Sequence, residues 1–184
     1  MTAPIASTVT ATNTWKLDPS HTSVEFSAKH MMLTTVKGRF GELEGTIVIN
    51  GATPKSANVR ATMKAASIDT RNEQRDGHLR SADFLDVESF PEVTFASTGT
   101  AGTKERFTIT GDLTIRGTTK SVTLDVTYEG AGIDPWGGER LGFSADTKID
   151  RREFALTYNQ VLEAGGVLVG NEIKIHIEAQ LVRA

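Results

Sequence analysis

Hydrophobic and polar residues alternate one by one along most of this chain. In the most regular run, one face carries only small or apolar residues: Ala57, Val59, Ala61, Met63 and Ala65. The same period of two recurs in residues 15–18, 23–30, 43–49, 93–97, 107–115, 122–128, 141–149 and 173–181. Successive side chains of a β-strand point to opposite faces, so the pattern predicts about eight strands, each with one buried and one wet face. Strands of this kind form an antiparallel sandwich or an up-and-down barrel.

The length of these runs favours the barrel. About eight residues at ~3.3 Å per residue span ~26 Å, which suits a barrel with depth. Several inward positions carry small residues: Ala28, Gly45, Ala57, Ala61, Ala65, Gly111, Ala145 and Ala179. The pattern is compatible with two kinds of barrel interior. One is a long cavity, and the other is a core filled by the large inward side chains, Phe26, Met63, Phe95, Phe107 and Phe143.

One segment, residues 69–91, lacks the strand pattern and predicts a short helix. Thr70 and Glu73 have the T-x-x-E spacing of a capping box, so we expect Asp69 or Thr70 as the N-cap and a helix beginning near Arg71. Because a sheet interrupted by one helix usually uses it as a cover, the helix is expected to pack on the barrel.

The loops carry two further predictions. Residues 31–36 cluster apolar side chains without strand phase and predict a mobile apolar loop, followed by turns at Gly38 and Gly41. Asn50-Gly51 predicts a two-residue hairpin turn, because both residues tolerate positive φ.

Composition narrows the class of protein. The 184 residues are most simply one domain, 14–184, after a flexible tail, 1–13, that lacks the features of a secretory signal. No run approaches the ~18 apolar residues of a membrane helix, so we expect no stable membrane insertion. The 20 basic and 23 acidic residues are mixed along the chain, which argues against nucleic-acid binding. The absence of cysteine fits a cytoplasmic location and does not exclude an exported protein.

Four motifs in order resemble the YceI-like family of polyisoprenoid-binding proteins. They are W-x-L-D-x-x-H-x-S-V-x-F at Trp15–Phe26, R-D-G-H-L-R-S-A-D-F-L-D-V-x-x-F-P at Arg75–Pro91, G-D-L-T-I-R-G at Gly111–Gly117 and R-x-E-F at Arg151–Phe154. The resemblance covers residues 15–182. Two positions depart from it: Leu85 stands where an aromatic residue is frequent, and Ala155 where glycine is common.

The resemblance implies an extended, lipocalin-like antiparallel barrel with a short helix packed at the lumen. It also implies binding of a long-chain polyisoprenoid, of the isoprenoid quinone or polyprenyl phosphate type, for storage, transport or sequestration, with no other cofactor. The sequence does not decide whether the protein forms a homodimer. The candidate lumen residues are Phe26, His30, Leu33, Phe40, Ala61, Met63, Phe84, Phe95, Phe107 and Phe143. The head-group candidates, as sequence neighbours of the apolar loop and helix, are Lys29, Lys37, Arg39, Arg75 and Arg80.

Two other classes of function, an enzyme and a protein-binding module, fit the sequence less well. An enzyme would use Asp76, His78 and Asp83 as acid and base, yet the chain has no G-x-S-x-G elbow, P-loop or Rossmann fingerprint. A protein-binding module would use the outer sheet face, which is polar. No histidine pair has metal-ligand spacing, so no metal site is expected, and His30 is either a head-group contact or a buried structural residue.

Overall fold

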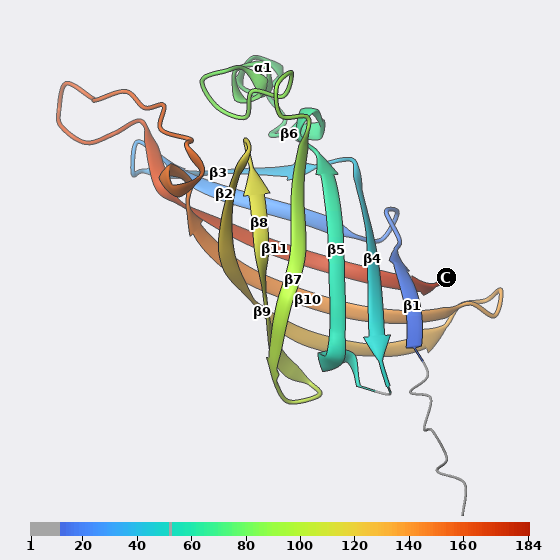
Figure 1. Cartoon of the computed structure of the whole chain (residues 1–184). Coiled ribbons are helices and arrows are strands. Elements are labelled where there is room, and N and C mark those ends of the chain that lie inside the picture. The colour runs from blue at the N-terminus through green and yellow to red at the C-terminus, as the bar shows by residue number, and fades with distance from the viewer. Residues whose placement is uncertain (1–11, 52) are drawn as a thin grey trace, which may run out of the picture.

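The structure, a computed structural model, describes residues 12–51 and 53–184 (Figure 1). The expected flexible tail lies outside the described residues except at its end. Thr12 and Asn13, which the sequence assigned to the tail, belong to the first strand. Among the described residues no helix is long and apolar enough to cross a membrane.

The described residues form eleven strands, one α-helix and three short 3-10 helices. The strands are β1 (Thr12–Leu17), β2 (Ser23–His30), β3 (Thr34–Phe40), β4 (Leu43–Asn50), β5 (Ala57–Lys64), β6 (Ile68–Asp69), β7 (Glu92–Gly102), β8 (Arg106–Ile115), β9 (Thr118–Ile133), β10 (Glu139–Asp150) and β11 (Val169–Arg183). The helices are η1 (Pro54–Ser56), η2 (Ala65–Ser67), α1 (Glu73–Arg80) and η3 (Arg151–Phe154).

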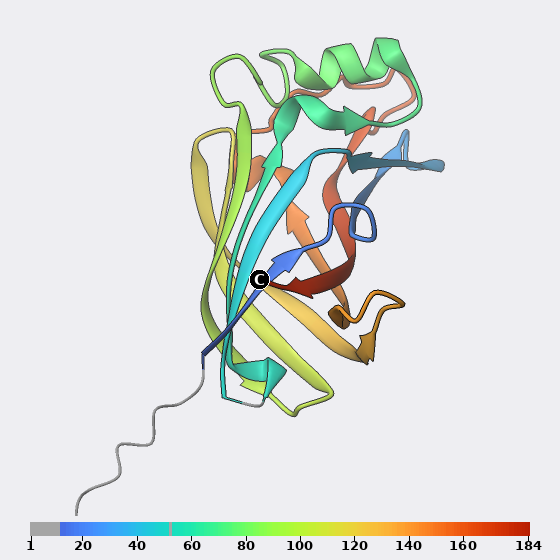
Figure 2. The same ribbon diagram turned by 90° about the vertical axis from the view of Figure 1, so that its right-hand side faces the viewer.

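Eight of these strands close into an antiparallel barrel in the order β1, β4, β5, β7, β8, β9, β10, β11 and back to β1. The long strand β11 serves two partners, since residues 169–178 pair with β2 and residues 181–183 pair with β1. β2 continues to β3, and β3 to β6, so these three strands extend the sheet beyond the closed ring (Figures 1 and 2). The predicted all-β barrel of about eight strands is confirmed.

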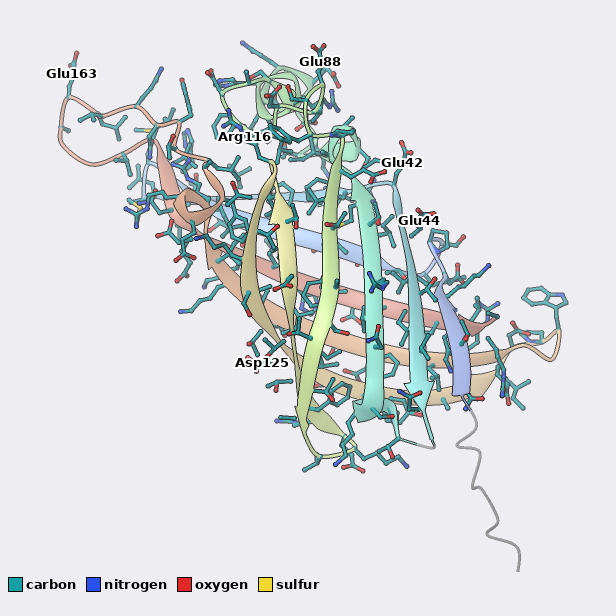
Figure 3. The ribbon with its side chains drawn as sticks, in the orientation of Figure 1. Glu42, Glu44, Glu88, Arg116, Asp125 and Glu163 are labelled. Atoms are coloured by element: carbon teal, nitrogen blue, oxygen red, sulfur yellow. The ribbon has the colours of Figure 1, made fainter. Side chains whose placement is uncertain are left out.

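The apolar residues of the alternating sequence pattern face the inside of the barrel. The inward residues form three apolar clusters, with Phe154 fully buried near α1, Trp15 and Leu181 at the closure, and Phe107 and Ala145 between them. Outward positions carry exposed polar side chains such as Asp125 of β9 (Figure 3). Period two is a property of the strand backbone itself, which is why the sequence pattern identified the faces correctly.

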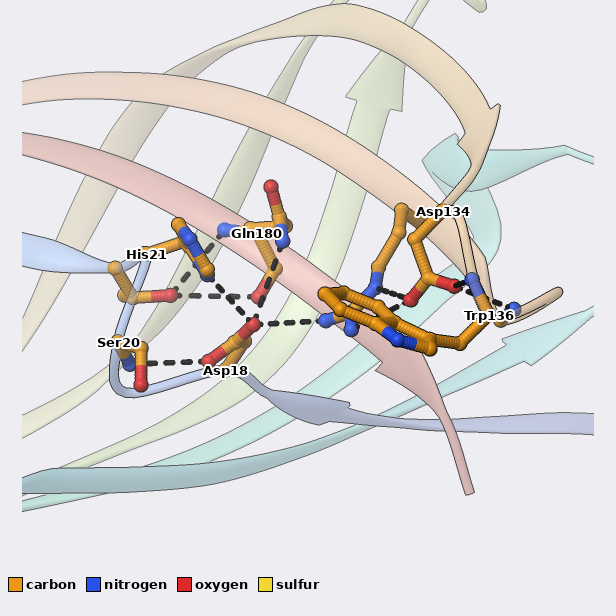
Figure 4. Close-up of polar contacts among 9 residues, drawn as sticks. Asp18, Ser20, His21, Asp134, Trp136 and Gln180 are labelled. Carbon is orange, nitrogen blue, oxygen red and sulfur yellow. Dashed lines mark hydrogen bonds and ion pairs between the residues drawn. The ribbon is translucent and has the colours of Figure 1, made fainter.

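A polar cluster holds the barrel closed beside the β1–β2 turn (Figure 4). The Asp18 carboxylate accepts hydrogen bonds from His21 at 2.9 Å, from the Arg140 guanidinium at 2.7 Å and from the Gln180 amide at 3.3 Å. Arg140 also donates to Asp134 at 2.9 Å. The contacts join the β1–β2 turn, β10, β11 and the β9–β10 hairpin at one point.

Glycine permits close approach inside the barrel. A Cβ atom at Gly38 would lie 2.4 Å from Cζ of Phe26, and one at Gly111 would lie 2.4 Å from Cζ of Phe95. Each ring therefore lies across the neighbouring strand where a larger residue would clash. Gly38 is within β3 rather than at the expected turn.

Both loop predictions need correction. The segment expected as a mobile loop, 31–36, is a tight turn at Met31 and Met32 followed by Leu33, with β3 already begun at Thr34 because its backbone pairs with β2. β4 and β5 do form a hairpin, and Gly51 has the expected positive φ of 79°, but η1 lengthens the connection beyond two residues.

The helix exists where the sequence placed it, with a different N-terminus. Asn72 is the N-cap, and its side chain accepts a hydrogen bond from the Arg75 amide at 2.9 Å. Thr70, the expected cap, instead donates its hydroxyl to Asp76, and Asp69 accepts from the Arg71 amide. These hydrogen bonds hold residues 69–71 outside the helix. The helix therefore begins at Glu73 instead of near Arg71.

Candidate ligand-binding cavity

The barrel encloses a cavity of ≈ 630 Å³. Its lining comes from the inward rows of the barrel strands and of β2, from α1, and from the loop after η3, and most of it is apolar. In β5 every inward residue from Ala57 to Met63 takes part, so the cavity follows this strand for ~20 Å. Pro54 of η1 lines it at one end of β5, and α1 lies at the other. The interior is therefore a long apolar channel.

Nine of the ten predicted lumen residues line this cavity: Phe26, His30, Phe40, Ala61, Met63, Phe84, Phe95, Phe107 and Phe143. The large side chains among them form its wall and do not fill the space, which favours the cavity over the filled core. Leu33 is the exception. It follows the β2–β3 turn, lies outside the lining and has a side chain 77% exposed. The turn directs it to solvent because the inward row of β2 ends at His30.

Exposed polar residues of the lining gather at the α1 end of the channel. They are Lys29 and His30 from β2, Arg75 and His78 from α1, and Gln160 from the loop after η3. We call these five residues the entrance, because there the lining reaches solvent. The one other exposed polar residue of the described lining is Glu44, at the start of β4.

The head-group candidates separate into two groups. Lys29 and Arg75 lie in the entrance, whereas Lys37, Arg39 and Arg80 do not line the cavity. Arg39 faces outward toward Asp69, with Nε to Oδ2 at 3.4 Å. Arg80 donates to the carbonyl oxygens of Ala66 and Ile68 and so fastens α1 to the chain before it. Nearness in sequence did not decide these positions, because side chains alternate between the two faces of β3 and point in different directions around α1.

A buried polar network fixes α1 above the channel. Oδ1 of Asp76, whose residue is only 3% exposed, accepts hydrogen bonds from the Thr70 amide at 2.9 Å and from the Thr70 hydroxyl at 2.5 Å. Arg75 donates to the hydroxyl and the carbonyl oxygen of Thr70 at 2.7 and 2.9 Å. Satisfied polar groups of this kind set the position of an element.

Three rings meet beside the entrance. His78 packs edge-on against Phe84 and Tyr158, with ring centroids 5.0 and 4.9 Å apart, and Phe84 lies 5.1 Å from Tyr158. His78 Nε2 also contacts Asp83 Oδ2 at 2.8 Å. Asp76 is bonded to Thr70 and does not join His78 and Asp83 in one group. The arrangement is that of a packed cover and does not support the acid–base hypothesis.

Arg151 is a lining residue that the sequence pattern did not indicate. It is 3% exposed, lines the cavity, and donates to the carbonyl oxygens of Gly170 at 3.0 Å, Leu156 at 2.5 Å and Tyr158 at 2.9 Å. Burial lowers the pKa of its guanidinium. The R-x-E-F motif was the available signal. Ala155, where glycine is common, has a left-handed φ of 59°, which explains that preference.

The other histidines lie apart from the channel. His21 contacts Asp18 and supports the turn after β1. His176 is on the outer face of β11, where Asp146 and Glu178 flank its ring and the hydrogen bond to Asp146 raises its pKa. Within residues 12–51 and 53–184, no three His, Asp or Glu side chains are arranged to hold a metal ion.

Comparisons with known proteins agree with this architecture. The sequence model of the YceI-like domain family matches residues 15–181. Over 145 residues the chain is 40% identical to Protein YceI of Salmonella newport, covering 78% of this chain and 76% of that protein. The crystal structure of the Campylobacter jejuni YceI protein is 30% identical with a TM-score of 0.73, covering 85% of this chain and 90% of that one.

A more distant structure shares the fold. The polyisoprenoid binding domain from Saccharophagus degradans superposes with a TM-score of 0.70 at 12% identity, covering 92% of this chain and 98% of that one. The match to the family model spans nearly the whole described barrel, including the strands that line the channel. This chain belongs to the YceI-like family.

Proposed function

We propose that the protein binds a long-chain polyisoprenoid lipid in its channel, for storage, transport or sequestration. The observation that carries the proposal is the channel itself, ≈ 630 Å³ in volume and lined by apolar side chains along a whole strand. An isoprenoid chain buried there gains about 25 cal/mol per Å² of apolar surface removed from water, less the free energy needed to immobilise it.

The comparisons support this class of ligand. The Saccharophagus degradans structure of the same fold is described as a polyisoprenoid binding domain. That description applies to the other protein, and it supports the present proposal only because the two proteins share the barrel fold. The apolar lining of this chain's channel is independent support for the same class of ligand, because it suits any long unsaturated hydrocarbon.

The head group of the lipid is proposed to lie at the entrance. Lys29 and Arg75 supply exposed N–H donors there, and the buried Arg151 adds positive charge to the same lining. Glu44 is the only carboxylate in the described lining. This balance favours a phosphate or a quinone carbonyl, because both accept hydrogen bonds from cationic donors.

The proposal is one of binding and needs neither catalysis nor a further cofactor. The cytoplasmic location stays a prediction from the sequence, to be checked by cell fractionation.

Native mass spectrometry of freshly purified protein, followed by organic extraction, tests the proposal. We expect a bound species that extraction releases as an isoprenoid lipid, because an apolar channel is costly to fill with water. A titration with farnesol, a short isoprenoid alcohol, covers the case in which purification strips the ligand. Polypeptide mass alone, together with no uptake of farnesol, would contradict the proposal.

A further inference from the structure

The turn between β2 and β3 presents three large apolar side chains to solvent. Met31, Met32 and Leu33 are 39%, 62% and 77% exposed. The Leu33 amide donates to the His30 carbonyl oxygen at 3.0 Å, which closes a tight turn with Met31 and Met32 at its centre. Exposed apolar residues are ordinary when scattered singly, but three in succession at a hairpin tip call for an explanation.

The backbone of this turn makes the choice of residues more unusual. Met31 and Met32 have φ of 52° and 59°, the left-handed values of a type I′ hairpin turn. Asn-Gly meets this geometry without strain, whereas side chains such as methionine adopt it only at a cost in conformational energy. The chain therefore keeps two methionines where a smaller, polar pair would be more stable.

The base of a second hairpin lies beside this turn. The loop after η3 folds back on itself through the Val161–Val167 bridge, and the Met31 amide donates to its Leu168 carbonyl oxygen at 2.8 Å. Val161 is 84% exposed. Of the six exposed large apolar residues in the described part of the chain, three thus lie at the β2–β3 turn and Val161 lies in the bridge at the base of the second hairpin; the remaining two are on the β9–β10 hairpin.

Both hairpins adjoin the entrance. His30, directly before the turn, lines the cavity, and so do Gln160 and Leu168 of the second hairpin. Figure 1 shows the β2–β3 turn and this loop projecting together at one side of the barrel, and Figure 3 shows Glu163 at the end of the loop. The exposed apolar side chains therefore lie beside the place where the channel meets solvent.

We propose that Met31, Met32, Leu33 and Val161 form a docking tip that inserts into the interfacial layer of a lipid bilayer. Docking holds the entrance against the membrane, so that an isoprenoid chain passes between bilayer and channel without crossing water. The inference rests on the proposed function, since it explains how so insoluble a ligand is loaded.

A bilayer fits this docking tip better than a protein partner does. Stable protein–protein interfaces bury about 800 Å² on each partner, which is far more than these four side chains present. An interfacial element needs only apolar side chains that reach roughly 5–10 Å into the boundary of head groups and acyl chains. The apolar side chains supply the driving force for insertion. The exposed cations Lys29 and Arg75 at the entrance outnumber the carboxylate of Glu163 at the loop end, so anionic lipid should add a modest further gain.

Flotation of the full chain with vesicles tests the docking tip. The vesicles are of phosphatidylcholine, alone or mixed with phosphatidylglycerol. The Met31→Asn/Met32→Gly variant removes two apolar side chains and gives the turn its preferred residues, so the fold is expected to be at least as stable as the wild type in thermal unfolding. Partition into vesicles is expected to fall by roughly tenfold or more, because burying even one such side chain exceeds the free energy of a tenfold change in affinity.

Two further variants make the test independent of the turn. Val161→Ser reduces partition without touching the β2–β3 backbone. Ile133→Ser/Trp136→Ser removes equally exposed side chains from the β9–β10 hairpin and leaves partition unchanged. Absence of wild-type flotation, equal flotation of the Asn/Gly variant, or an equal loss in the Ile133/Trp136 control would each overturn the proposal.

Uptake of farnesol from solution separates this inference from the proposed function. Met31 and Met32 do not line the cavity, so the Asn/Gly variant should bind farnesol like the wild type. If both proteins bind farnesol while neither floats, the docking tip is wrong and the binding function stands. If neither binds farnesol and no isoprenoid lipid co-purifies with the wild type, the proposed function fails, and the docking inference fails with it.

Discussion

Asp18 acts at the point where the barrel closes. Its carboxylate accepts hydrogen bonds from His21, Arg140 and Gln180, and thereby ties three parts of the chain that are distant in sequence. The hydrogen bond from His21, partly offset by burial and reinforced by the Ser20 amide and the Arg140 charge, holds the pKa of this carboxyl below its usual value. Ionised Asp18 is thus favoured by folding.

Substitution of Asp18 should therefore change the pH dependence of stability. A carboxyl whose pKa is lower in the folded protein contributes stability above its unfolded pKa of about 3.9 and loses it as the pH falls through the folded pKa. Asp18→Asn is expected to lower the free energy of unfolding at neutral pH by roughly 1.5–3 kcal/mol, the range for hydrogen bonds to charged groups. It should also flatten the decline of stability below about pH 4.

Urea unfolding across the acidic range measures both effects. Asp125→Asn, on the exposed outer face of β9, is the matched control and should change stability by less than about 0.5 kcal/mol. An acid decline in Asp18→Asn as steep as that of the wild type would show that this carboxylate does not support the closure.

At the scale of elements, α1 depends on its tethers. Isolated helices shorter than about 12 residues are marginal in water, and α1 runs only from Glu73 to Arg80. Asn72 caps it, while the bonds of Arg75 and Arg80 fasten it to the segment before it. His78 and Leu79 line the cavity, so the helix and the ligand share a surface.

We expect ligand to protect α1 from hydrogen exchange. Bound isoprenoid adds contacts to the cavity side of the helix, so amides of residues 73–80 should exchange more slowly with ligand, and those of the β2–β3 turn should follow. Asn72→Ala removes the cap at a cost of about 1 kcal/mol and should speed exchange in α1 in the absence of ligand. Asn58→Ala, on the outer face of β5, should not. Equal exchange with and without ligand would contradict a covering role for α1.

The elements also show how far the sequence could predict this structure. Alternation identified the inward rows, and its absence in residues 69–91 together with capping residues indicated α1, because both signals are local in sequence. The division of β11 between β1 and β2, the start of β3 at Thr34 and the outward position of Leu33 depend on pairing between distant segments. Arg151 escaped notice for the same reason, since its burial comes from carbonyl groups of the loop and β11 folding around it.

At the scale of the whole molecule, the small inward residues keep the channel open. Ala61 is opposite Gly45 on β4 and Phe95 on β7, in the middle of a strand whose inward row lines the cavity. A larger side chain at this point has unoccupied channel in front of it. In a close-packed core the same change would meet other side chains and cost roughly 1–3 kcal/mol or more.

The amount of isoprenoid bound per folded molecule of Ala61→Trp tests the central claim most directly. Farnesol titration is read against the folded fraction from thermal unfolding, with the outward-facing Arg60→Trp as the control. We predict that the indole occupies ligand volume, so uptake falls sharply while the free energy of unfolding changes by less than about 1 kcal/mol and the control binds normally. Unchanged binding per folded Ala61→Trp molecule, or loss of the fold, would contradict a ligand channel through the barrel.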